Sequence, residues 1–140
     1  MEKKRVLIVD DAPLMRMVVQ NILEGDPNLE VVGKARNGAE GLKQVNELKP
    51  DIVILDIEMP IMDGLTFLRH ARGQFPGKIL VLSAVTALGS SSAVEAKTLG
   101  ADAVMSKPSG TVSLDLEERR GSELVKTIYM LLGLKHEKFS

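Results

Sequence analysis

Short apolar runs alternate with longer amphipathic stretches along the whole of this 140-residue sequence. Each run is rich in β-branched residues, and apolar positions with helical spacing follow it, so the chain is predicted to alternate between strand and helix. This order is typical of an α/β fold in which helices cover both faces of a parallel sheet. The predicted strands are 6–9, 31–35, 52–55, 79–82 and 103–105, and the predicted helices are 13–25, 39–48, 65–72, 91–99 and 122–132.

The length of the chain and its 44% content of hydrophobic residues predict one globular domain with one core. We assign residues 1–134 to this domain. Residues 109–120, in which Gly, Ser and Thr precede a charged patch, are predicted to form a long inserted surface loop before the last helix. Residues 135–140 are polar and are interpreted as a polar tail or a truncated linker.

The composition excludes several classes of site and partner. The 18 basic and 19 acidic side chains give a formal net charge of -1, which provides no basic surface for nucleic acid or anionic lipid. The absence of cysteine excludes disulfides, thiolate metal sites and cysteine nucleophiles. The apolar runs are much shorter than the ~20 residues that span a bilayer. We therefore expect a cytoplasmic protein whose partners are proteins or small molecules, with no nucleic acid or membrane partner.

Polar residues lie at or just beyond the ends of four of the five predicted strands. They are Asp10 and Asp11 after the first strand, Asp56 after the third, Ser83 after the fourth and Lys107 after the fifth. Taken singly, each has an ordinary structural explanation as a helix cap, a turn residue or a solvated charge. Ligands of open parallel sheets bind beyond the carboxyl ends of the strands, where all of these residues are predicted to lie. Their coincidence at one edge therefore predicts a functional site.

Three carboxylates at one sheet edge would repel one another, and such a cluster persists when a cation offsets the charge. Oxygen ligands favour Mg2+, with Mn2+ as an alternative, because softer metals prefer His or Cys. Neither His70 nor His136 follows a strand, and both are interpreted as surface residues. Lys107 supplies a positive charge and Ser83 a hydroxyl for an anion beside the metal. The predicted anion is phosphate.

The polar motifs resemble those of the receiver domains of two-component response regulators, and the resemblance covers about residues 4–134. The resemblance implies a flavodoxin-like, doubly wound fold with a five-stranded parallel sheet in the order 2-1-3-4-5, five helices and a single domain. The motifs are Val-Leu-Ile-Val-Asp-Asp at 6–11, Ile-Leu-Asp-Ile-Glu-Met-Pro at 54–60, Asp-Gly at 63–64, Ser-Ala at 83–84 and Lys-Pro at 107–108.

The resemblance also implies a ligand set for the metal. Asp11 corresponds to a direct ligand, and Asp10 to a second acidic residue that acts directly or through water. Asp56 and the backbone carbonyl of Glu58 correspond to the remaining protein ligands. The implied cofactor is Mg2+.

The reaction implied by the resemblance is phosphoryl transfer. Asp56 corresponds to the phosphoacceptor, and the implied donor is a histidine kinase. Lys107 corresponds to the cation that pairs with the phosphoryl group, and Ser83 to the hydroxyl that moves toward it. Conformational change would then carry the signal to a downstream effector domain or protein.

Two further segments, 85–92 and 107–114, resemble the N-terminal regulatory domain of the chemotaxis protein-glutamate methylesterases. This implies that the chain regulates a methylesterase domain. The chain itself lacks that domain, because its sequence contains no Gly-x-Ser-x-Gly nucleophile elbow. A free-standing receiver that acts on a protein partner is the alternative. The chain is expected to phosphorylate itself rather than to turn over a substrate, and whether the full-length protein is an enzyme stays open.

Two rival functions remain. An aspartyl-nucleophile phosphatase also uses Asp, Mg2+ and Lys, and Glu58 imitates its second acid two residues after the nucleophile. The position of Asp56 on the third predicted strand and the lack of a cap domain disfavour this reading. A receiver-like interaction module that has lost phosphorylation is disfavoured by the complete set of acidic residues together with Ser83 and Lys107.

Overall fold

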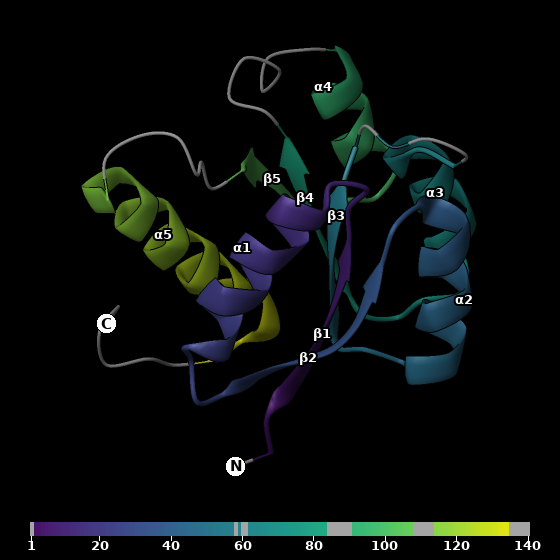
Figure 1. The fold of residues 1–140 in the computed structure, drawn as a ribbon. Coiled ribbons are helices and arrows are strands. Elements are labelled where there is room, and N and C mark those ends of the chain that lie inside the picture. The colour runs from purple at the N-terminus through teal and green to yellow at the C-terminus, as the bar shows by residue number, and fades with distance from the viewer. Residues whose placement is uncertain (1, 58, 60–61, 84–90, 108–113, 135–140) are drawn as a thin grey trace.

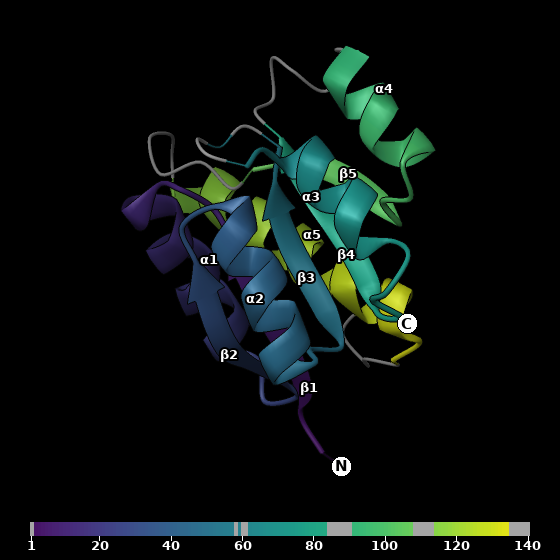
Figure 2. The same ribbon diagram turned by 90° about the vertical axis from the view of Figure 1, so that its right-hand side faces the viewer.

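The structure is a computed structural model that describes residues 2–57, 59, 62–83, 91–107 and 114–134. Within them, five parallel strands form one sheet in the order β2-β1-β3-β4-β5, with helices on both faces (Figures 1 and 2). This confirms the predicted fold and strand order. The elements are β1 (Lys4–Val9), α1 (Pro13–Glu24), β2 (Leu29–Ala35), α2 (Gly38–Leu48), β3 (Ile52–Asp56), α3 (Gly64–Ala71), β4 (Lys78–Ser83), α4 (Ser91–Thr98), β5 (Ala103–Ser106) and α5 (Leu114–Leu132).

The sheet divides the expected single core into two apolar layers. Leu7 and Val9 of β1 belong to the layer beneath α2, α3 and α4, whereas Val6 and Ile8 belong to the layer beneath α1 and α5. Figure 1 shows α1 and α5 on one side of the sheet and α2 and α3 on the other. Successive strand side chains point to opposite faces, so burial on both faces requires strands that are apolar throughout.

Local sequence signals fix the ends of the first four helices, whose bounds lie within one residue of the predicted ones. Pro13 opens α1, where its missing N–H costs no helical hydrogen bond. The side chain of Asn37 caps α2 by accepting from the Glu40 N–H at 2.9 Å. Gly100 follows α4 with a φ of 112°, a conformation that glycine adopts without strain.

The predicted loop at 109–120 is wrong for residues 114–120, because α5 begins at Leu114. Residues 109–113 lie outside the described ranges. Leu, Glu and Arg are strong helix formers, and the acidic residues that open this segment are favourable near a helix N-terminus. Gly121 therefore lies inside the helix. It packs toward α1, and a Cβ there would meet the side chain of Ile22 at 3.4 Å.

Helix α4 is attached to the body of the protein by small residues. Its buried residues are Ala93 and Ala96, whereas Val94 is 63% exposed. An exposed ion pair between Arg69 and Glu95, at 2.9 Å, joins α4 to α3. No helix in the described part of the chain is long and apolar enough to cross a membrane.

Tyr129 joins α5 to the turn between α1 and β2. Its hydroxyl donates to Asp26 Oδ1 at 2.7 Å and accepts from the side-chain amide of Asn28 at 2.8 Å. Burial of the phenol, together with its hydrogen bond to Asp26, raises the pKa of Tyr129 above its usual value of 10.0. The turn and the C-terminal half of α5 are therefore held together by a buried polar contact as well as by apolar packing.

The raised pKa of Tyr129 can be measured directly, because the chain has one tyrosine and no tryptophan. We expect the phenolate absorbance of the folded protein to reach its midpoint above pH 10.0, and to return to that value in concentrated urea. Since the folded state holds the proton more tightly, its contribution to stability is present below the unfolded pKa and is lost as pH rises through the folded pKa.

A matched variant tests the same contact. Tyr129→Phe should lower the free energy of unfolding at neutral pH by about 1–3 kcal/mol, because it leaves the buried Asp26 carboxylate with one donor fewer. Equal stability of Tyr129→Phe and the unsubstituted protein would contradict this contribution of the contact. An ionisation midpoint at pH 10.0 for the folded, unsubstituted protein would contradict the raised pKa of Tyr129.

Candidate functional site

Two neighbouring strands bring the three predicted acidic residues together. Asp10 directly follows β1, and Asp56 is the last residue of β3, which pairs with β1. One carboxylate oxygen from each of Asp10, Asp11 and Asp56 lies within 4.8 Å of the other two. Asp10 and Asp56 are each 3% exposed, whereas Asp11 is exposed. The predicted cluster is therefore present, with one side open to solvent.

Lys107 reaches this cluster from the end of β5. Its ammonium lies 3.0 Å from Asp56 Oδ1 and 3.8 Å from Asp10 Oδ2. Partial burial lowers the pKa of Lys107, but the hydrogen bond to Asp56 and the charges of Asp10, Asp56 and Asp11 outweigh this and raise it above its usual value. The side chain is therefore a permanent positive charge at neutral pH.

Ser83 lies at the same edge as the last residue of β4. It is 5% exposed, and its carbonyl accepts a hydrogen bond from the main-chain N–H of Lys107 at 2.9 Å. The predicted ligand Glu58 lies outside the described residues, as does His136. His70 is exposed on α3. The structure thus brings together Asp10, Asp11, Asp56, Lys107 and Ser83 at one sheet edge.

Asp10 and Asp11 do not cap α1, which was the ordinary explanation for this pair. The N-cap residue is Ala12, and no side chain caps the helix. Asp10 Oδ1 instead accepts from the Ala12 N–H at 2.9 Å within the loop. Burial raises the pKa of the Asp10 carboxyl above its usual value, although this hydrogen bond and the Lys107 ammonium act in the opposite direction.

The donor set fits a hard divalent cation. Three carboxylates of the described residues face one ammonium, so the negative charge at this edge exceeds what Lys107 can offset. All three donors are oxygens, which suits Mg2+ or Mn2+. The exposed side at Asp11 suits an ion that keeps several water ligands, as Mg2+ does.

Gly64 lies against the backbone of Asp56 and Ile57 at the end of β3. The Gly64 N–H donates to the Ile57 carbonyl at 2.8 Å, and a Cβ at residue 64 would lie 2.5 Å from the Asp56 carbonyl oxygen and 2.7 Å from Ile57 Cα. Only glycine permits this approach of α3 to the end of β3. Sequence reasoning noted Gly64 within a motif but assigned it no contact.

Arg16 is a residue of the site region that sequence reasoning missed. Its guanidinium donates to the main-chain carbonyl of Asp10 at 2.6 Å. The available signal was an arginine six residues after Asp10, in the first turns of the predicted helix.

A cavity of about 550 Å³ lies elsewhere, at the opposite edge of the sheet where β3 and β4 begin. Lys49, Asp51 and Phe75 are among the residues that line it. The predicted site residues that the structure describes do not line this cavity, so it is separate from the acidic cluster.

A model of the family described as the response regulator receiver domain matches residues 6–128. The chain belongs to this family. It is therefore a receiver domain of two-component signalling, which confirms the resemblance inferred from the motifs.

Individual relatives of the receiver domain agree with this assignment. The chain is 47% identical over 116 residues to a protein-glutamate methylesterase/protein-glutamine glutaminase of Halalkalibacterium halodurans, an alignment that covers 83% of this chain and 34% of that protein. The chain thus spans about a third of the length of the curated relatives it matches. The similarity to the methylesterase regulatory region confirms the closer resemblance.

Solved structures give the same result. The response regulator domain of Thermotoga maritima CheB superposes with a TM-score of 0.83 and 34% identity, covering 96% of this chain and 100% of that chain. A chain from the complex of the P1 domain of CheA3 with CheY6 from R. sphaeroides superposes with a TM-score of 0.79 and 42% identity, covering 95% and 99%.

The close contact at Gly64 predicts a cost for any side chain there. Gly64→Ala should lower the free energy of unfolding by about 1–3 kcal/mol, because the new Cβ overlaps backbone atoms that cannot turn away. Urea unfolding measures this. Gly73→Ala is the matched control, because a Cβ there meets nothing within 4 Å. Equal stabilities of the two variants would contradict the inferred contact.

Proposed function

We propose that the chain is a phosphorylation-dependent signalling switch that accepts a phosphoryl group on Asp56 from a histidine kinase, with Mg2+ as cofactor. The observation that supports this most directly is the grouping of three carboxylates and the Lys107 ammonium at one sheet edge of a receiver domain. Asp56 is the proposed nucleophile because its carboxylate lies closer to the Lys107 ammonium, at 3.0 Å, than that of Asp10, at 3.8 Å.

Asp10, Asp11 and Asp56 would hold the metal, together with the main-chain carbonyl of Glu58, which lies outside the described residues. Mn2+ would suit the same oxygen donors. When bound, the ion supplies positive charge that offsets the negative charge of the phosphoryl oxygens.

In the proposed reaction, a carboxylate oxygen of Asp56 forms a bond to phosphorus while the bond from phosphorus to the donor imidazole nitrogen breaks. The nitrogen keeps the electron pair of the broken bond, and Asp56 becomes an acyl phosphate. The ammonium of Lys107 stays beside the new group and pairs with its oxygens. Positioning and charge account for the catalysis, because the side chains make and break no other bond.

The phosphoryl group is proposed to change the surface through Lys107 and Ser83. It adds a charge of roughly -1.5 to -2 and three acceptor oxygens beside these residues. The Ser83 hydroxyl would donate to one of these oxygens, and the ends of β4 and β5 are already joined by the Lys107 N–H and the Ser83 carbonyl. The added contacts favour one of the conformations that the loops adopt beforehand.

The proposed partners are a histidine kinase and a protein-glutamate methylesterase domain. The similar chain from the complex of CheA3 with CheY6 supports the first, since receiver domains act with such kinases. The names of the curated relatives support the second. A free-standing receiver acting on another protein partner is the alternative.

Labelling with a small acyl phosphate and Mg2+ tests the phosphoacceptor. We expect intact mass spectrometry to detect one added phosphoryl group per chain, and Asp56→Asn to abolish it, because an amide oxygen is a poor nucleophile. Asp63→Asn is the matched control: Asp63 caps α3 outside the acidic cluster, and asparagine caps helices equally well.

The outcome also separates the rival functions. Labelling of Asp56→Asn at the rate of the unsubstituted protein would show that the nucleophile is misassigned. Repeated turnover of a phosphate monoester would favour an aspartyl phosphatase, and absence of any label would favour a module that has lost phosphorylation.

A reconstituted assay tests the proposed effector. We expect the unphosphorylated chain to slow methyl-ester hydrolysis by the catalytic domain of the Halalkalibacterium halodurans relative, and acyl phosphate with Mg2+ to relieve the inhibition. Asp56→Asn should inhibit equally but show no relief. A rate of methyl-ester hydrolysis that changes neither when the chain is added nor when the chain is phosphorylated would contradict regulation of a methylesterase.

A further inference from the structure

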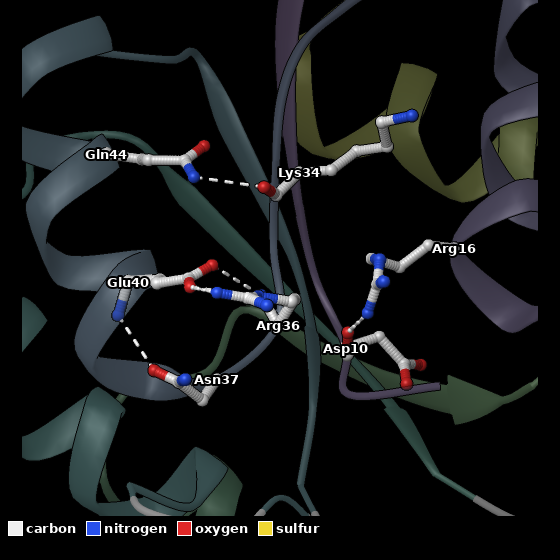
Figure 3. A network of polar contacts seen from close by, with 7 residues as sticks. All are labelled: Asp10, Arg16, Lys34, Arg36, Asn37, Glu40 and Gln44. Carbon is white, nitrogen blue, oxygen red and sulfur yellow. Dashed lines mark hydrogen bonds and ion pairs between the residues drawn. The ribbon is translucent and has the colours of Figure 1, made fainter. Parts of the chain in front are cut away.

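Arg16 holds the peptide that joins the first two acidic residues of the site. Its guanidinium reaches back from α1 and donates to the main-chain carbonyl of Asp10 at 2.6 Å (Figure 3). This carbonyl belongs to the same peptide plane as the N–H of Asp11. The hydrogen bond therefore restrains the orientation of the backbone that leads into Asp11.

The two carboxylates differ in how firmly the protein holds them. Asp10 is buried, its main-chain N–H donates to the Ala35 carbonyl at 3.0 Å, and its Oδ1 accepts from the Ala12 N–H at 2.9 Å. The side chain of Asp11 is exposed and forms no hydrogen bond with the part of the chain that the structure describes. The position of Asp11 thus depends on its backbone.

We propose that Arg16 is a positioning residue for the metal site: by fixing the peptide between Asp10 and Asp11, it keeps the Asp11 carboxylate near those of Asp10 and Asp56. This rests on the proposed binding of Mg2+ by these residues. A ligand that is already in place loses less conformational freedom when the ion binds, so the affinity is higher. Residues that hydrogen-bond to metal ligands and orient them commonly raise the affinity for the metal in this way.

The positive charge of Arg16 would act in the opposite direction. A guanidinium near the site repels a cation, so a role through charge alone predicts tighter binding of Mg2+ when Arg16 is replaced by a neutral residue. A role through the hydrogen bond predicts weaker binding. The sign of the change therefore distinguishes the two mechanisms.

Two substitutions and one control make the comparison. Arg16→Met removes both the charge and the donor, whereas Arg16→Lys keeps the charge but ends one bond short of the terminal guanidinium nitrogen that donates to Asp10. Arg36→Met is the control, because Arg36 is an exposed arginine on the far side of β2 that pairs with Glu40 at 2.8 Å and does not contact Asp10 (Figure 3).

The experiment measures the binding of Mg2+ to the full chain by calorimetry. We expect Arg16→Met to weaken binding by about tenfold, the lower end of the range for loss of an outer-shell partner. Arg16→Lys should weaken it to a smaller extent, and Arg36→Met should not weaken it. Labelling by acyl phosphate should need more Mg2+ for half its maximal rate in Arg16→Met, while the rate at saturating Mg2+ stays unchanged.

Each other outcome has a defined meaning. Binding of Mg2+ by Arg16→Met that equals or exceeds that of the unsubstituted protein overturns the positioning role. Equal weakening in Arg36→Met, or a lower labelling rate in Arg16→Met that saturating Mg2+ does not restore, overturns it as well. If Arg16→Met does not fold, unchanged binding by Arg16→Lys overturns the proposal. Failure of the unsubstituted protein to bind Mg2+ overturns instead the proposed function.

Discussion

A parallel sheet that is covered on both faces can hold charged groups only at the ends of its strands. The central strands β1, β3 and β4 are apolar except at their ends, because their side chains face one of two packed layers, whereas the edge strand β2 carries the exposed Glu30 and Lys34. Charged side chains inside these layers would lose their hydration without compensation. The chemistry of the molecule is therefore confined to the positions where strands end, which is where Asp10, Asp56, Ser83 and Lys107 lie.

The acidic edge is stable because cationic and backbone groups offset much of its repulsion. Lys107 pairs with the two buried carboxylates, and the backbone N–H of Ala12 donates to Asp10. Arg16 and Gly64 do not supply groups for the chemistry, yet each contacts the backbone of a residue that does. The site thus consists of residues that take part in the proposed chemistry and residues that support them. The supporting residues are hard to predict from the sequence.

The residues of the proposed chemistry could be predicted from the sequence because they lie at the ends of strands, and apolar runs in the sequence show where the strands are. Sequence reasoning also placed the first four helices to within one residue, since Pro13 and the glycines after α1 and α4 are local signals. It misplaced the start of α5, where Gly121 resembles a break but instead allows close packing against Ile22. Tyr129 contacts a turn about 100 residues away in the sequence. Arg16 and Gly64 contact the backbone of nearby residues across a loop, and no periodic pattern predicts these contacts.

The contacts that hold α4 against the rest of the protein contribute little free energy. Two buried alanines contribute little apolar area, and an exposed ion pair such as that of Arg69 with Glu95 contributes about 0–1 kcal/mol. Arg72 donates to the Gly100 carbonyl at 2.8 Å and so anchors the chain directly after α4. Few contacts therefore hold α4, and segments of this kind open locally at a lower free-energy cost than core strands. A newly formed hydrogen bond to a charged group contributes about 1.5–3 kcal/mol, which is more than this exposed ion pair contributes.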